Sequence, residues 1–331
     1  MGEGPALVVA EGALHEQILD QTHAVWSDGL SRKGYGQYNT AQLSTRWGAR
    51  HLRRLALVQG DQVLASAKRY DLRAALDGRA ISIVGIGAVF TPPELRGRGY
   101  GRHIVEAMLA EARRDGRELA LLFSEIGTAY YERLGFRAVP IAATELSIRG
   151  RAGAPAIPIR TGDERDLAFI AEIHGSHARR YRFALQYDPD WLQYSVAKRR
   201  LLCGLASDGR RSVEFHVVEE GTRPVAWLLI QVECDDADAQ SPERWTVESC
   251  GDRDPSGARV GAMLQALIAR TPAAPAPDIR AWWPARFAPP QLDHRPRGPS
   301  SITMMVRPID NLPLTAPLTA ENVLYWHADA F

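Results

Sequence analysis

A long apolar segment that runs into a glycine-rich turn limits the folds open to this chain. Residues 81–90 (ISIVGIGAVF) are apolar almost throughout, as expected for a strand at the centre of a sheet covered on both faces. The turn TPPELRGRGYGR follows at residues 91–102, and residues 101–114 carry apolar side chains at helical spacing, which predicts an amphipathic helix. A buried strand that enters a helix through such a turn is typical of α/β proteins.

The neighbouring segments extend this unit into an α/β (α+β) domain with a mixed, mostly antiparallel central sheet. The elements that we expect are a strand (6–10), helices (14–25, and from Asn39 as N-cap to about 47), a hairpin (51–58 and 63–70), the central strand and helix, a strand (118–123), a short helix (128–134) and a final strand pair (136–148).

The chain divides into two parts of similar length. Residues 150–158 (GRAGAPAIP) are rich in Gly, Ala and Pro without any period, which is typical of a linker. We therefore expect a first domain over residues 1–149 and a second α+β domain over 159–331, with short strands near 279–283 and 302–306. The second domain fits either a degenerate copy of the first fold or an unrelated α+β fold.

Composition argues against several function classes. The 40 Lys and Arg residues balance 39 Asp and Glu to a net charge of +1, so nothing points to nucleic acid or an anionic membrane as partner. Three cysteines without a CxxC pair predict neither a disulfide framework nor a metal site. The longest apolar stretches run to about ten residues, against roughly 20 for a membrane span. With no signal-peptide pattern at the N-terminus, we expect a cytoplasmic protein.

The glycine-rich turn is the strongest indication of chemistry. A turn that opens a helix can direct several free backbone N–H groups at one point, where the helix dipole adds positive potential and favours a phosphate. Gly97, Gly99 and Gly101 leave the backbone uncovered, so a pyrophosphate can approach closely. The turn is neither a Walker P-loop nor a GxGxxG dinucleotide fingerprint.

Two motifs resemble the GNAT N-acetyltransferase superfamily. The pattern Arg96-x-x-Gly99-x-Gly101 is similar to the loop with which that family binds the pyrophosphate of acyl-coenzyme A, and the downstream segment AYYERLGF (129–136) is similar to its second motif. The resemblance covers roughly residues 6–148 and implies a GNAT fold with acetyl-CoA as co-substrate. This sequence differs from the family pattern at Thr91, where an apolar residue is usual, and at Ser124, where many members have asparagine.

The resemblance also implies roles for individual residues. In the family, the motif tyrosine protonates the departing thiolate, and this role falls on Tyr131. The cofactor-binding set carried over is Val89, Thr91, Arg96, Gly97, Arg98, Gly99, Tyr100, Gly101, Arg102 and Ser124. A backbone N–H of Val89 or Thr91 is expected to stabilise the oxyanion.

Acetyl transfer to an amine also needs a group that accepts the ammonium proton. The central strand contains no carboxylate, so the candidates are Glu125, which follows strand 118–123, and Asp71. The aromatic C-terminus, LYWHADAF, predicts a docked tail. A distant resemblance to the enhanced-intracellular-survival acetyltransferases suggests that this tail returns to the active site, where Asp329 or the Phe331 carboxylate assists proton removal.

The function implied is transfer of an acetyl group from acetyl-CoA to a primary amine of a small molecule, by direct attack in a ternary complex. The phrases VFTPPELRGRGYGRH and LFSEIGTAYYERLGF also resemble fungal lysine N-ε-acetyltransferases, which favours free lysine or another amino acid. We expect the acceptor pocket at the aromatic residues Trp26, Tyr35, Tyr38 and Trp47. An antibiotic- or polyamine-modifying enzyme is the alternative if the cleft is wide and acidic, and a CoA-binding regulatory module without turnover is the alternative outside enzymes.

Overall fold

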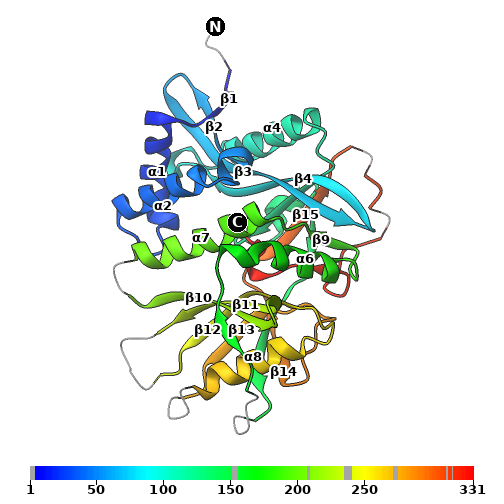
Figure 1. Ribbon diagram of the computed structural model, residues 1–331. Helices are drawn as coiled ribbons and strands as arrows, with labels where there is room; N and C mark the ends of the chain where they lie inside the picture. Colours follow the sequence, from blue (N-terminus) through cyan, green and yellow to red (C-terminus); the bar gives the residue numbers. More distant parts are fainter. Residues whose placement is uncertain are drawn as a thin grey trace.

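The computed structural model describes residues 4–150, 156–206, 209–234, 241–270, 275–310, 312–314 and 316–331. Residues 151–155 of the expected linker lie outside this range. Figure 1 shows two sheets, one in the upper and one in the lower half of the view, with helices α6 (Leu167–Ala178) and α7 (Pro189–Leu205) between them. No helix within the described residues is long and apolar enough to cross a membrane.

The first sheet has nine strands within the described residues, and seven of them follow the order β1-β2-β3-β4-β5-β15-β6. These strands are β1 (Ala6–Val9), β2 (Leu52–Gln59), β3 (Gln62–Leu76), β4 (Arg79–Phe90), β5 (Leu119–Ser124), β15 (Thr303–Pro308) and β6 (Arg137–Val139), while β9 (Phe183–Leu185) pairs with β3 and with β16 (Val323–Leu324). Among the seven, only β4 and β5 pair in parallel. The predicted mixed, mostly antiparallel sheet is therefore confirmed.

The helices of the first half are α1 (Gly12–Trp26), α2 (Arg32–Ser44), α3 (Gly48–His51), α4 (Tyr100–Arg114) and α5 (Ala129–Glu132). Helix α4 buries Ile104, Met108 and Ala112 against the first sheet, as its spacing predicts. The prediction that the second helix starts at Asn39 is wrong. Ser31 caps α2 by accepting a hydrogen bond from the N–H of Gly34, and Asn39 instead accepts one from Arg54 inside the fold.

The second half repeats the order of elements in the first half. Its sheet runs β14-β7-β13-β12-β11-β10-β8, and α8 (Ala258–Ala269) connects the parallel pair β12 and β13 as α4 connects β4 and β5. The strands are β8 (Ile159–Thr161), β10 (Arg211–Glu220), β11 (Arg223–Glu233), β12 (Arg244–Asp252), β13 (Asp278–Trp282) and β14 (Leu292–Pro299), with β7 (Ala142–Ile148) from the first half. The sequence left two possibilities for the second domain, and this order of elements corresponds to a degenerate copy of the fold of the first domain.

The two halves exchange one strand each. Strand β15 of the second half lies between β5 and β6 of the first sheet, and β7 of the first half lies between β13 and β14 of the second. The expected strand pair at 136–148 is therefore wrong, as is the assignment of 302–306 to the second sheet. Burial differs between the two exchanged strands: Met304, Met305 and Val306 of β15 are almost fully buried, as in a strand covered on both faces, whereas β7 alternates buried and exposed residues, as in a strand with one face exposed.

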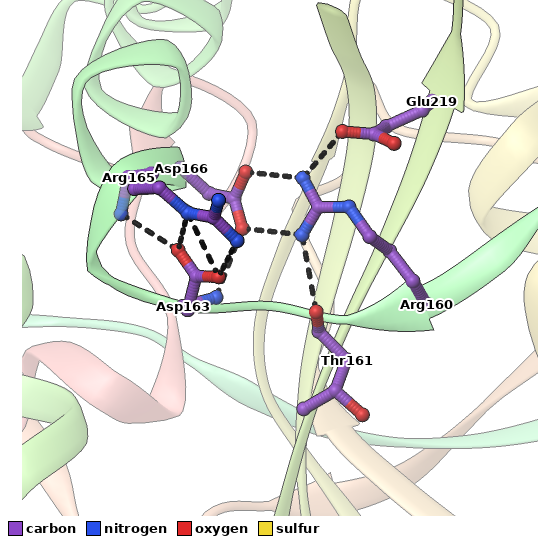
Figure 2. Close-up of polar contacts among 6 residues, drawn as sticks. All are labelled: Arg160, Thr161, Asp163, Arg165, Asp166 and Glu219. Carbon is purple, nitrogen blue, oxygen red and sulfur yellow. Dashed lines mark hydrogen bonds and ion pairs between the residues drawn. The ribbon is translucent and has the colours of Figure 1, made fainter. Parts of the chain in front are cut away.

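An ion-pair cluster ties the first strand of the second half to the helix that follows it (Figure 2). The Arg160 guanidinium donates to both carboxylate oxygens of Asp166, at 2.8 and 2.6 Å, and to Glu219 at 2.6 Å. Asp163 accepts hydrogen bonds from the backbone and the side chain of Arg165. These contacts join β8 to β10 and to the N-terminus of α6.

Candidate active site

Strands β4 and β5 separate at their C-terminal ends. Their parallel pairing ends at Ile86 with Leu122, yet β4 continues to Phe90 and β5 to Ser124. The two strands therefore open a wedge-shaped gap at one edge of the paired region, and this gap lies beside the start of α4.

A β-bulge shapes the β4 side of this gap. Lys68 pairs with Gly87 and Ser66 with Phe90, so two residues of β4, Ala88 and Val89, stand opposite a single residue of β3. Ala88 has a left-handed φ of 48°. The bulge turns this part of the backbone out of the regular ladder, so an N–H group here can serve a ligand in the gap.

The predicted pyrophosphate turn leads into α4. Gly97 and Gly99 have φ values of 80° and 84°, and Gly99 is the N-cap of the helix. A Cβ built on either glycine would have no protein atom within 4 Å, so the space above them is open. Arg96 donates to the carbonyl oxygen of Thr91 at 3.3 Å, which closes the turn. The turn leaves room for an anion at the helix N-terminus.

The remaining residues of the cofactor-binding prediction surround this turn. Tyr100 begins α4, Gly101 follows it beside the hydroxyl groups of Thr91 and Tyr130, and Arg98 lies between Gly97 and Gly99. Arg102 forms an ion pair with Glu106 on the same helix, at 2.8 Å. Val89 and Ser124 lie on the opposite side, in the gap between β4 and β5.

Tyr131 lies on α5 with its side chain turned into the protein. The residue is 8% exposed, and its ring packs edge-on against Tyr130 and Phe136. Burial raises the pKa of Tyr131 to about 12, with smaller contributions from Tyr130 and Glu125. The phenol is therefore protonated at neutral pH and can act as a proton donor.

A cavity of about 470 Å³ lies between the two halves of the chain and includes the gap between β4 and β5. Of the predicted site and pocket residues, it is lined by Val89, Ser124, Glu125, Tyr131, Trp26, Tyr35, Tyr38 and Phe331. Trp47 lies instead in a buried aromatic cluster with Trp191 and Tyr194. A second cavity of about 550 Å³, beside Leu201 and Phe215, contains none of the predicted site residues.

Comparison with known proteins supports the same assignment. Residues 13–139 match the family model of the acetyltransferase (GNAT) domain. These residues are a GNAT domain. The GNAT resemblance read from the two sequence motifs is thereby confirmed, and this match to an acetyltransferase domain supports the prediction of an enzyme. No curated protein matches the sequence at a significant level.

Solved structures share the fold over nearly the whole chain. A GCN5-related N-acetyltransferase from Anabaena variabilis aligns with 93% of this chain and 73% of its own, at 12% identity and a TM-score of 0.70. Eis1 from Mycobacterium abscessus aligns with 93% of this chain and 74% of its own, at 16% identity and a TM-score of 0.56. N-myristoyltransferase of Saccharomyces cerevisiae with bound myristoyl-CoA covers 93% and 83%, at 9% identity and a TM-score of 0.53.

The second half lacks the open turn of the GNAT domain. Gly257 caps α8 with a φ of 73°, as Gly99 caps α4. A Cβ on Gly257, however, would lie 2.6 Å from Phe287 and 3.0 Å from Pro289. Protein side chains therefore fill the space at the N-terminus of α8, and only the first half has room for a pyrophosphate there.

The C-terminal tail returns to the cavity of the GNAT domain, as we hypothesised. The Phe331 ring packs on Tyr70 and Phe123, and a Cβ on Gly85 would lie 2.5 Å from that ring. The Asp329 carboxylate is instead engaged in structural contacts. It accepts hydrogen bonds from the Tyr187 hydroxyl at 2.7 Å and from the N–H of Trp326 at 2.8 Å.

Glu125 and Asp71, the two candidate proton acceptors outside the tail, differ in position. Glu125 is exposed and lines the cavity. Asp71 forms ion pairs with Arg53, Arg69 and Arg117 and does not line the cavity, which excludes it from contact with a substrate there.

Several charged residues of the cavity were missed by sequence reasoning. They are Arg54, Lys68, Lys198, Arg199, Glu248 and His327. Glu248 bonds to Arg199 at 2.6 Å and to the Nδ1 atom of His327 at 3.1 Å. Burial raises the pKa of Glu248, but Arg199 and His327 outweigh it and lower the pKa to about 2. No local motif marks these residues, because they meet only when the second half packs on the first.

Proposed function

We propose that this protein transfers an acetyl group from acetyl-CoA to a primary amine of a small molecule, by direct attack in a ternary complex. The observation that carries the proposal is that the gap between β4 and β5 and the buried phenol of Tyr131 adjoin one cavity, and that β4 leads from this gap into a turn that is open at Gly97 and Gly99. The first half would bind the acyl-CoA, and the second half would complete the acceptor side.

The residues of the site have complementary roles in this reaction. Backbone N–H groups at the start of α4 would hold the pyrophosphate, and the backbone at the bulge, with the N–H of Val89 as our candidate, would bind the oxyanion of the tetrahedral intermediate. The amine nitrogen attacks the thioester carbonyl carbon, which forms the new C–N bond and the tetrahedral intermediate. After the ammonium proton has passed to an acceptor, the intermediate collapses and the C–S bond breaks. Tyr131 then donates its phenolic proton to the departing thiolate.

Three groups that line the cavity are candidates to accept the ammonium proton. Glu125 and the Phe331 carboxylate are the candidates predicted from the sequence. His327 is the third, because Glu248 accepts from its Nδ1 atom and thereby orients the ring. Measuring kcat/KM against pH for the variants Glu125→Gln and His327→Asn distinguishes them, since only loss of the true acceptor abolishes the ascending limb.

The alternatives receive less support. An antibiotic- or polyamine-modifying enzyme would need an acidic cleft to attract its cationic substrate. The lining of this cavity is mixed in charge, since it holds the acidic residues Asp28, Glu125 and Glu248 and the basic residues Arg54, Lys68, Lys198 and Arg199. A regulatory module without turnover has no need of a buried phenol facing the acyl-transfer gap.

The experiment that tests the proposal follows release of free thiol from acetyl-CoA in the presence of a panel of amines. We expect thiol release that depends on an added amine, together with acetyl-CoA binding by calorimetry. Binding without amine-dependent release from any panel member would favour the regulatory module, and absence of binding would reject the cofactor assignment.

A further inference from the structure

The second cavity, of about 550 Å³, lies beside helix α7 and contains none of the residues assigned to acetyl transfer. Leu167 of α6 and Phe215 of β10 contribute to its lining. One face of α7 forms its long wall, because the lining residues recur at helical spacing: Gln193, Val196, Ala197, Arg200, Leu201, Gly204 and Leu205. The volume falls within the range of about 300 to 1,000 Å³ that is usual for binding sites of small molecules.

The lining of the second cavity is mainly apolar. Leu167 and Phe215 are buried, whereas Leu201 and Leu205 are only half-buried. A Cβ on Gly204 would meet no protein atom within 4 Å, so the space beside the last turns of α7 is open. Apolar side chains that remain in contact with water gain stability when a ligand covers them, and such patches often mark binding sites.

The charged groups of the second cavity differ in whether they have partners inside the protein. The Asp163 carboxylate accepts hydrogen bonds from Arg165 (Figure 2). Glu164 accepts one from the Gln193 amide at 3.0 Å. Arg200 is exposed, and across the described part of the chain its guanidinium forms neither an ion pair nor a hydrogen bond. Arg200 is therefore free to bind an anion.

We propose that the second cavity is a binding site for a small amphiphile that has an apolar chain and a single carboxylate. The chain lies along α7 against Ala197, Leu201 and Phe215. The Arg200 guanidinium binds the carboxylate through two parallel hydrogen bonds, the geometry that suits both groups. One unpaired cation matches one negative charge, whereas a doubly charged phosphate would lie near acidic side chains without a second free cation in this lining.

The two cavities lie on different faces of α7. Lys198 and Leu202 line the first cavity, and Ala197 and Leu201 line the second. A ligand of the second cavity is therefore distinct from acetyl-CoA and from its acceptor, and its binding can be measured without assuming acetyl transfer.

Calorimetry with simple amphiphiles tests the chemistry of the ligand. The probes are hexanoate, octanoate and decanoate, with 1-octanol as the uncharged analogue of octanoate and decyltrimethylammonium as a cationic amphiphile. We expect the affinity to rise about fourfold for each added methylene group, as for burial of an apolar chain. Octanoate should bind about tenfold or more tightly than 1-octanol, because only octanoate forms charge-assisted hydrogen bonds.

Two variants test the location of the site. Ala197→Phe should fill the cavity and abolish decanoate binding. Arg200→Met should weaken decanoate binding about 10- to 100-fold and remove the preference for octanoate over 1-octanol. The matched controls are Ala110→Phe and Arg114→Met, at exposed positions of α4 that line neither cavity, and both should bind as the wild type does. Urea unfolding checks that each variant is folded, and Arg200→Met, at an exposed position, keeps the test if Ala197→Phe does not fold.

Four results would overturn the proposal. The first is absence of decanoate binding to the wild type, and the second is equal decanoate affinity in the wild type and Arg200→Met. The third is tighter binding of decyltrimethylammonium than of decanoate, which would reject the carboxylate. The fourth is binding that Lys68→Met abolishes and Ala197→Phe retains, which would place the probe in the first cavity.

Gel filtration of the ligand-free protein tests the other possible occupant, a second copy of this chain. We expect the wild type and Ala197→Phe to elute at the same volume. A wild-type dimer that Ala197→Phe converts into a monomer would show that this face of α7 is an interface between two chains, and would overturn the assignment to a small ligand.

Discussion

At the scale of single residues, the buried phenol of Tyr131 is the group whose removal most directly tests the mechanism. The change Tyr131→Phe keeps the ring packed against Tyr130 and Phe136 and deletes the proton. We expect kcat to fall by about 10- to 10⁴-fold, the range for loss of a general acid, with acetyl-CoA affinity nearly unchanged. Steady-state kinetics and calorimetry check both values.

Tyr181→Phe is the matched control for Tyr131→Phe. Tyr181 is buried to a similar degree, 7% exposed, but packs in the core of the second half. This variant should retain wild-type turnover. If Tyr131→Phe also turned over at the wild-type rate, the thiolate would be leaving without protonation by this phenol.

The buried carboxyl group of Asp329 should make the free energy of unfolding fall as the pH rises. Burial raises the pKa of its carboxyl to about 6, against opposing hydrogen bonds from Tyr187 and Trp326. Because the folded-state pKa lies above the unfolded value near 3.9, this residue's contribution is complete below pH 4 and is lost as pH rises through 6. The free energy of unfolding should therefore lose about 3 kcal/mol over this pH range.

The variant Asp329→Asn removes this titration. Between pH 4 and pH 7 the free energy of unfolding of the wild type should decline relative to that of the variant by about 3 kcal/mol. Urea unfolding at several pH values measures the difference. A difference that stays constant with pH would show that Asp329 is ionised in the folded protein throughout.

At the scale of elements, the turn before α4 allows a test with matched backbone strain. Gly99 and Gly116 both have left-handed φ values, 84° and 67°, and a Cβ on either would meet no protein atom within 4 Å. The changes Gly99→Val and Gly116→Val therefore impose a similar strain at opposite ends of the same helix. We expect calorimetry to show that only Gly99→Val abolishes acetyl-CoA binding, because only there does the side chain obstruct the pyrophosphate.

Equal loss of binding in both variants would mean that strain, and not obstruction of a ligand, explains the effect. Gly101 is less suitable for this test, because a Cβ there would lie 2.9 Å from the Tyr130 hydroxyl. A change at Gly101 would displace a protein side chain as well as a ligand.

Elements whose residues are consecutive were predictable from the sequence, and those that depend on distant partners were not. The central strand and α4 follow from local apolar spacing, and the turn between them from its glycines. The position of β15 depends on which sheet has two strands between which it can pair and be buried. The local sequence of β15 does not contain this information. The same reason hides the cationic residues of the cavity: Arg54 and Lys68 become neighbours only through strand register, and Lys198 reaches the cavity from the other half of the chain.

At the scale of the whole molecule, the exchanged strands make each half depend on the other. Without β15, strand β5 would lose the partner that covers its free edge, although Leu119, Ala120 and Leu121 are fully buried in the complete fold. An uncovered apolar edge strand promotes aggregation. The cavity has the same dependence, because its lining comes from α7, β12 and the tail as well as from the GNAT domain.

Cleavage of the chain between the halves tests this dependence. A specific protease site placed within residues 150–158 cuts the chain without removing any strand, and the two fragments should remain together in native buffer because each contributes a strand to the other's sheet. Gel filtration should show one species after cleavage, which separates only in denaturant, and acetyl-CoA binding should persist. As the control, a fragment of residues 1–149 expressed alone should be insoluble. Co-expression with a fragment of residues 159–331 should make it soluble. Fragments that separate in native buffer and stay soluble would contradict the strand exchange.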